Sequence, residues 1–91
     1  MHKYQKIIDQ CDQATRSVSA LLDESQLNDA LDYINKFDEW KLGLEFVIDW
    51  LVEGGAKVSD MQYQLFHLAF ESMNCTNDSR LLQLKLLCDP A

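Results

Sequence analysis

The stretch that decides the fold of this chain is Asp38-Glu39-Trp40-Lys41-Leu42-Gly43-Leu44-Glu45-Phe46-Val47-Ile48-Asp49-Trp50-Leu51-Val52-Glu53. Its apolar residues recur at the three- and four-residue spacing of an amphipathic helix. The pattern predicts a helix that Asp38 caps and that ends near Glu53, where Gly54-Gly55 supplies a left-handed stop. Gly43 is costly inside a helix, by roughly 1 kcal/mol relative to Ala, so we expect a neighbouring helix to approach closely there. The side that is expected to face the core carries Trp40, Gly43, Phe46, Val47, Trp50 and Leu51.

The same spacing continues in the residues that precede this stretch. It predicts a first helix over residues 3–23, followed by a second, shorter helix for which Ser25 is the candidate N-cap. The apolar face of the first helix is Ile7, Ile8, Cys11, Ala14, Val18, Leu21 and Leu22, and that of the second is Leu27, Ala30, Leu31 and Ile34.

Capping signals divide the residues that follow the stretch into two further helices. Ser59 and Gln62 match a capping box, and Val58 and Tyr63 match a hydrophobic staple, so a helix is predicted from there to about Asn74. Thr76-Asn77-Asp78 combines turn residues with a new N-cap, and the last helix is expected to stop before Pro90. The expected inward residues are Leu65, Phe66, Ala69, Phe70 and Met73, and the last helix carries Leu81, Leu82, Leu84, Leu86 and Leu87.

These elements predict an all-α protein, with residues 1–91 forming a single small domain of four to five antiparallel helices. Short loops favour antiparallel packing of helices that are neighbours in sequence. The leucine-rich last helix either covers the core or forms a face for a homodimer, and its pattern fits both.

The amino-acid composition indicates which classes of partner and which cellular compartment to expect. The chain has 91 residues with Lys+Arg 8 and Asp+Glu 15, a formal charge of −7. This acidity argues against binding nucleic acid or an anionic membrane surface, because both need clustered Lys and Arg; a basic protein is the expected partner. The three cysteines are an odd number without a CxxC pair, and the first eight residues lack the apolar core of a secretory signal. We therefore expect a cytoplasmic protein.

The acidic residues of the decisive stretch fall on one side of the predicted helix. Asp38, Glu45, Asp49 and Glu53 lie within about 80° of arc at about 100° per residue, and only Lys41 is a nearby offset. One interpretation is a solvated face. The other is a partner-binding surface that imitates a polyanion and enters a cationic cleft. Leu42 and Val52 border this stripe, and Asp29 and Asp32 of the preceding helix extend its field.

The pattern offers little for catalysis or metal binding. His67 and Glu71 are four residues apart, but no HExxH motif or further ligand spacing accompanies them. Cys11 lies on the inward face of the first helix, so packing is its expected role. Gly54-Gly55 is a helix stop and not part of a phosphate-binding loop. We expect no catalytic residue, cofactor or metal, and a structural role for His67.

One part of the chain resembles a known family. The order Ala30-Leu31-Asp32-Tyr33-Ile34, Trp40-Lys41-Leu42-Gly43-Leu44-Glu45-Phe46, and then Ser59 and Tyr63 resembles the MafI family of bacterial immunity proteins. The resemblance extends from Leu27 to Met73, about half of the chain, and rests on helix patterning and not on catalytic residues.

This resemblance implies a non-enzymatic function. It implies an immunity protein that binds the C-terminal domain of a cognate secreted toxin, often an RNase or DNase, and neutralises it in the cytoplasm of the producing cell. The alternative is a general helical adaptor without a toxin partner. The two differ in whether the gene lies beside one that encodes a long secreted protein with a toxin domain at its end.

Overall fold

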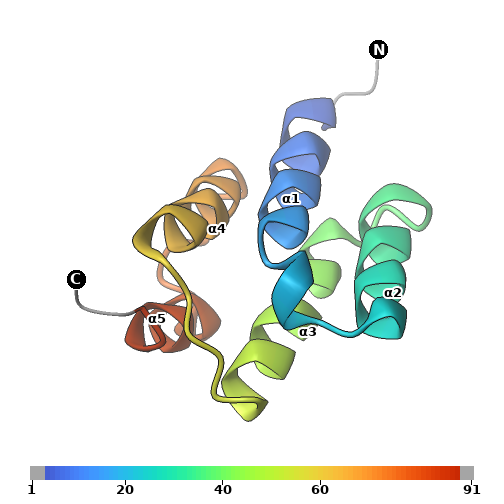
Figure 1. The fold of residues 1–91 in the computed structure, drawn as a ribbon. Helices are drawn as coiled ribbons and strands as arrows, with labels where there is room; N and C mark the ends of the chain where they lie inside the picture. Colours follow the sequence, from blue (N-terminus) through green and yellow to red (C-terminus); the bar gives the residue numbers. More distant parts are fainter. Residues whose placement is uncertain (1–3, 89–91) are drawn as a thin grey trace.

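The computed structural model describes residues 4–88 and builds them almost entirely from helices (Figure 1). The prediction of an all-α fold is confirmed, since the only β feature within residues 4–88 is an isolated bridge between Val58 and Cys88. Pro90 lies outside the described residues. The elements are α1 (Gln5–Ser17), the 3-10 turn η1 (Ser19–Leu21), α2 (Glu24–Asn35), α3 (Trp40–Glu53), α4 (Asp60–Ser72) and α5 (Ser79–Leu86).

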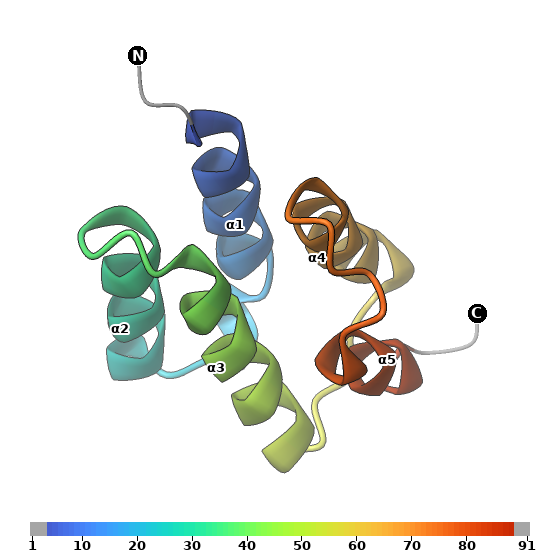
Figure 2. The same ribbon diagram turned by 180° about the vertical axis from the view of Figure 1, so that it is seen from behind.

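The first three α-helices run in alternating directions, as the short loops predict. Figures 1 and 2 show α2 returning beside α1, and α3 running back beside α2. Helix α4 packs against α1, and α5 contacts both α3 and α4. None of the helices within residues 4–88 combines the length and the apolar character that crossing a membrane requires.

One core connects the five α-helices. Phe66 and Phe70 of α4 are the largest of its fully buried side chains. Trp40 and Trp50, which were expected to be core residues, are only half-buried and pack on the edge of this core. The other fully or nearly fully buried residues are Ile8, Cys11, Ala14, Thr15, Val18, Ala30, Ile34, Leu44, Val47, Ile48, Leu51, Val58, Tyr63, Ala69, Leu81 and Leu84.

Two helix boundaries differ from their predictions. Helix α1 ends at Ser17, not near residue 23, and the chain tightens into η1, where Leu21 is exposed. Helix α2 is capped by Asp23 and not by Ser25, because Asp23 and Gln26 form a reciprocal capping box, with 2.8 Å from the Gln26 amide to the Asp23 carboxylate. Both residue types suit an N-cap, so only the local backbone decides between them.

The predicted cap of α3 is wrong, whereas three other end signals are confirmed. Asp38 has φ 53° and precedes the N-cap, Glu39, whose amide donates to the Tyr33 carbonyl at 2.8 Å. This bond ties the start of α3 to the end of α2, so the turn geometry excludes Asp38 from the capping position. The confirmed signals are the Ser59–Gln62 capping box, the Asp78 cap of α5 and the left-handed stop, which lies at Gly55 with φ 61°.

Gly43 lies where α2 and α3 approach most closely. A Cβ atom at this position would lie 2.9 Å from Ile34 Cγ1 and 3.1 Å from the backbone oxygen of Ala30. The expectation of a close helix approach is therefore confirmed, and the missing side chain is what permits it.

We expect Gly43→Ala to destabilise the protein, although alanine favours a helix. Overpacking costs about 1–3 kcal/mol, and the gain in helix propensity offsets at most about 1 kcal/mol. The free energy of unfolding from urea denaturation measures the balance, with the exposed substitution Gln64→Ala as control. A Gly43→Ala protein that is more stable than the parent would contradict this account of the α2–α3 contact.

Helix α5 covers the core with only one of its sides. Leu81 and Leu84 are buried, whereas Leu82 and Leu86 are 61% and 85% exposed. Of the two alternatives for this helix, covering the core is therefore part of its role.

Candidate functional site

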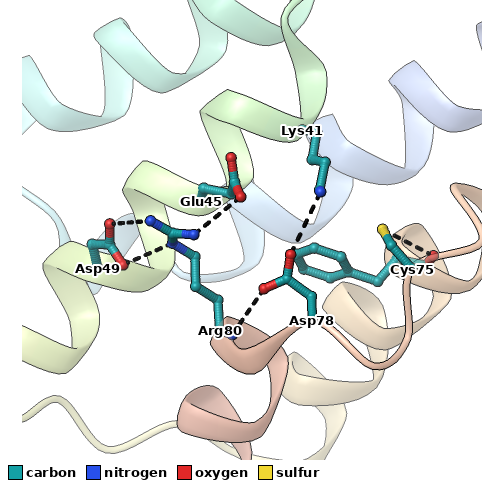
Figure 3. Close-up of polar contacts among 7 residues, drawn as sticks. Lys41, Glu45, Asp49, Cys75, Asp78 and Arg80 are labelled. Carbon is teal, nitrogen blue, oxygen red and sulfur yellow. Dashed lines mark hydrogen bonds and ion pairs between the residues drawn. The ribbon is translucent and has the colours of Figure 1, made fainter.

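The acidic stripe predicted on α3 is engaged at its centre by a cation from another helix. Arg80 of α5 donates from Nε to Asp49 Oδ1 at 3.0 Å and from Nη1 to Glu45 Oε2 at 3.1 Å (Figure 3). The expectation that only Lys41 offsets the stripe is therefore wrong. The sequence pattern could not reveal this contact, because Arg80 lies 35 residues after Glu45 and 31 residues after Asp49.

Asp78 joins the cluster formed by Arg80, Glu45 and Asp49, and it contacts both α3 and α5. Its side chain caps α5 by accepting the backbone amide of Arg80 at 2.9 Å, and it lies 3.5 Å from the Lys41 ammonium group (Figure 3). The hydrogen bond to Asp49, with the charges of Asp49, Glu45 and Asp78, raises the pKa of Arg80 above its ordinary value. The guanidinium therefore stays charged at neutral pH. This cluster fixes α5 on α3.

The other predicted site residues are dispersed. Asp38 lies in the α2–α3 turn and is exposed, so it does not share the helical stripe. Glu53 is exposed at the C-terminal end of α3. Asp32 is half-buried on α2 and pairs with Lys36 at 3.6 Å. Leu42 is half-buried, and Val52 is 36% exposed.

The acidic charge is nevertheless concentrated in one part of the structure. Residues 24–53, which we call the acidic hairpin, comprise α2, α3 and the turn between them. They hold eight carboxylates against two lysines, a net charge of −6 out of the total of −7. Arg80 neutralises one of these charges, which leaves the hairpin as the dominant source of negative potential.

An aromatic row runs across the acidic hairpin, and the sequence did not predict it. Tyr33 and Phe37 pack edge to face at 6.0 Å between ring centroids, Tyr33 and Phe46 lie at 5.3 Å, and Phe46 stacks on Trp50 at 5.8 Å. Phe37 is 60% exposed, and the other three rings are half-buried. The available signal was the four-residue spacing of Tyr33 and Phe37 and of Phe46 and Trp50, but Phe46 and Trp50 were assigned to the core.

The aromatic row and the Arg80 cluster lie on different sides of α3. Phe46 meets Tyr33 of α2, whereas Glu45 and Asp49 meet Arg80 of α5. Helix α3 is therefore held by α5 on one side, and it presents aromatic rings together with α2 on the other.

Groups that could act as nucleophiles or bases are dispersed or buried. Within residues 4–88, no group of three or more His, Cys, Asp or Glu side chains could hold a metal ion. Cys11 is fully buried, as predicted, and burial raises the pKa of its thiol to about 12. The thiol of Cys75 lies 3.6 Å from the Phe70 carbonyl oxygen, and burial raises its pKa as well. His67 packs at 6.0 Å from the Tyr63 ring.

Comparison with known proteins does not assign this chain to a family. No family model, no curated protein and no solved structure matches it.

Proposed function

We propose that this chain is an immunity protein that binds a cognate secreted toxin domain in the cytoplasm of the producing cell and neutralises it. The observation that carries the proposal is the concentration of negative charge, −6 of −7, on the acidic hairpin. The resemblance to the MafI family suggests the kind of partner. Clustered negative charge fits a toxin domain with a basic surface, such as the substrate groove of an RNase or DNase.

The acidic hairpin suits rapid capture of such a toxin. A field of one sign accelerates the encounter with an oppositely charged partner by about 10- to 1,000-fold at low ionic strength. Speed is useful to an immunity protein because toxin that is still unbound can act on the cell.

The Arg80 cluster changes which carboxylates should be tested. Glu45 and Asp49 hold α5 in place, so replacing them would disturb the fold together with the charge. Asp29 of α2 and Glu53 of α3 are both exposed, and their removal leaves the Arg80 contacts intact. They are the suitable positions for separating charge from folding.

We expect the double substitution Asp29→Lys and Glu53→Lys to slow association about tenfold or more at low salt. The probe is the C-terminal domain encoded by the reading frame next to this gene, with association measured by stopped flow at several salt concentrations. The matched control is Asp9→Lys with Glu71→Lys, which makes the same change in total charge at exposed positions of α1 and α4.

The outcomes separate two parts of the proposal. Failure of the parent protein to bind that domain and to rescue growth on co-expression would overturn the immunity function. Rescue by the parent, with equal slowing in both charge variants, would retain the immunity function and overturn the role of the acidic hairpin.

A further inference from the structure

We infer that the aromatic row is the surface that receives arginine side chains of the basic partner. The inference rests on the proposed binding of a basic protein and specifies where, and by which side-chain chemistry, that protein is held. The occupant is thus an arginine-bearing segment of a folded partner.

The chemistry of the row favours a planar cation. An arginine guanidinium stacks on the faces of Trp, Tyr and Phe rings and retains its hydrogen-bond donors for neighbouring carboxylates. The row supplies four rings with consecutive centroids 5.3–6.0 Å apart, and Phe37 at its end is 60% exposed.

Carboxylates lie within reach of both halves of the row. Asp29 is one helical turn before Tyr33 on α2, and Glu53 is about one turn after Trp50 on α3; both are exposed. A guanidinium on the rings can therefore donate to an acidic side chain at the edge of the row. Aromatic residues also supply much of the energy at protein–protein contacts because they bury a large area with few rotatable bonds.

The remaining exposed apolar surface fits a basic partner less well. Leu82 and Leu86 of α5 offer no ring faces, and Lys85 lies between them in sequence. The α3 carboxylates that contact α5, Glu45 and Asp49, already bind Arg80. Charge complementarity thus selects the aromatic row over the α5 leucines.

A model peptide tests the inference without the toxin domain. The probe is Ac-Gly-Arg-Gly-Arg-Gly-Arg-Gly-NH2, titrated into the full protein while amide and indole NMR signals are followed. Matched peptides carry lysine or glutamine in place of arginine. We expect the largest changes in chemical shift at Tyr33, Phe37, Phe46 and Trp50. The arginine peptide should bind more tightly than the lysine peptide, and the glutamine peptide should not bind.

Two substitutions of equal exposure provide the comparison. Phe37→Ala is expected to weaken binding of the arginine peptide roughly two- to fivefold, the effect of one exposed cation–π contact. Leu82→Ala, at a side chain that is 61% exposed on α5, should leave binding unchanged. Unchanged thermal unfolding of Phe37→Ala verifies that its fold is intact.

The result that would overturn the inference is equal binding of the arginine and lysine peptides, or shifts centred outside the row. Loss of binding in Leu82→Ala and not in Phe37→Ala would do the same. These outcomes can be told apart from those of the toxin test. If the arginine peptide binds at the aromatic row but the toxin domain does not bind the protein, the result counts against the proposed function and not against this inference.

Discussion

Raising the pH from 7 to 11 is expected to lower the free energy of unfolding by roughly 3 kcal/mol through Cys11 alone. Burial, with a smaller contribution from neighbouring Cys75, raises the pKa of this thiol from 9.0 to about 12. Below pH 9 the thiol is protonated in both the folded and the unfolded chain, so its contribution is constant. Above pH 9 the unfolded chain binds fewer protons, and stability falls by about 1.4 kcal/mol per pH unit until the folded thiol also ionises.

Urea denaturation at a series of pH values from 7 to 11 measures this loss. Burial raises the pKa of Cys75, Cys88 and Tyr63 in the same direction, so the parent protein should lose stability through all four groups. Cys11→Ala removes one of them and should flatten the dependence above pH 9. An unchanged slope in Cys11→Ala would show that Cys11 ionises normally in the folded protein.

Truncating Phe66 is expected to cost about 3–5 kcal/mol, which is the usual range for removing a buried phenylalanine ring. Phe66 is fully buried in α4 and belongs to the core that the five α-helices share. A domain of this size is stabilised by about 5–14 kcal/mol in total, so Phe66→Ala should lose at least about a fifth of that stability.

The size of the cavity, and not the loss of an aromatic group, is the expected cause. Phe66→Leu retains most of the buried volume, so it should destabilise the protein less than Phe66→Ala does. Leu82→Ala serves as the surface control and should change the free energy of unfolding by no more than about 0.5 kcal/mol. A loss below about 1 kcal/mol in Phe66→Ala would contradict the placement of this ring in a closely packed core.

Local signals in the sequence predicted much of this fold. The Ser59–Gln62 capping box depends on two residues three apart, and the stop after α3 depends on a glycine that adopts φ 61°. Such features form within one helical turn, so nearby residues are sufficient to specify them. The prediction that Asp38 caps α3 failed because the conformation of the α2–α3 turn depends on a hydrogen bond from the Glu39 amide to the Tyr33 carbonyl.

The candidate site was less predictable because its parts come from different helices. Helical periodicity places Glu45 and Asp49 on one line, yet it contains no information on which side α5 covers. The same limitation applies to Phe46 and Trp50, whose spacing is typical of core residues. Both are half-buried, with Phe46 against Tyr33 of α2 and Trp50 stacked on Phe46. Partner-binding surfaces are defined by what remains uncovered after packing.

The sequence by itself determined the all-helical fold, the burial of Phe66, Ala69 and Phe70 in α4, the need to explain a glycine inside α3 and the excess of negative charge. Each follows from local spacing, from the steric needs of a single residue or from composition. Only the tertiary structure decided that Arg80 occupies the centre of the acidic stripe and that four aromatic rings form a continuous row. These contacts join helices through packing, and their geometry depends on the relative position of whole helices, which no local pattern specifies.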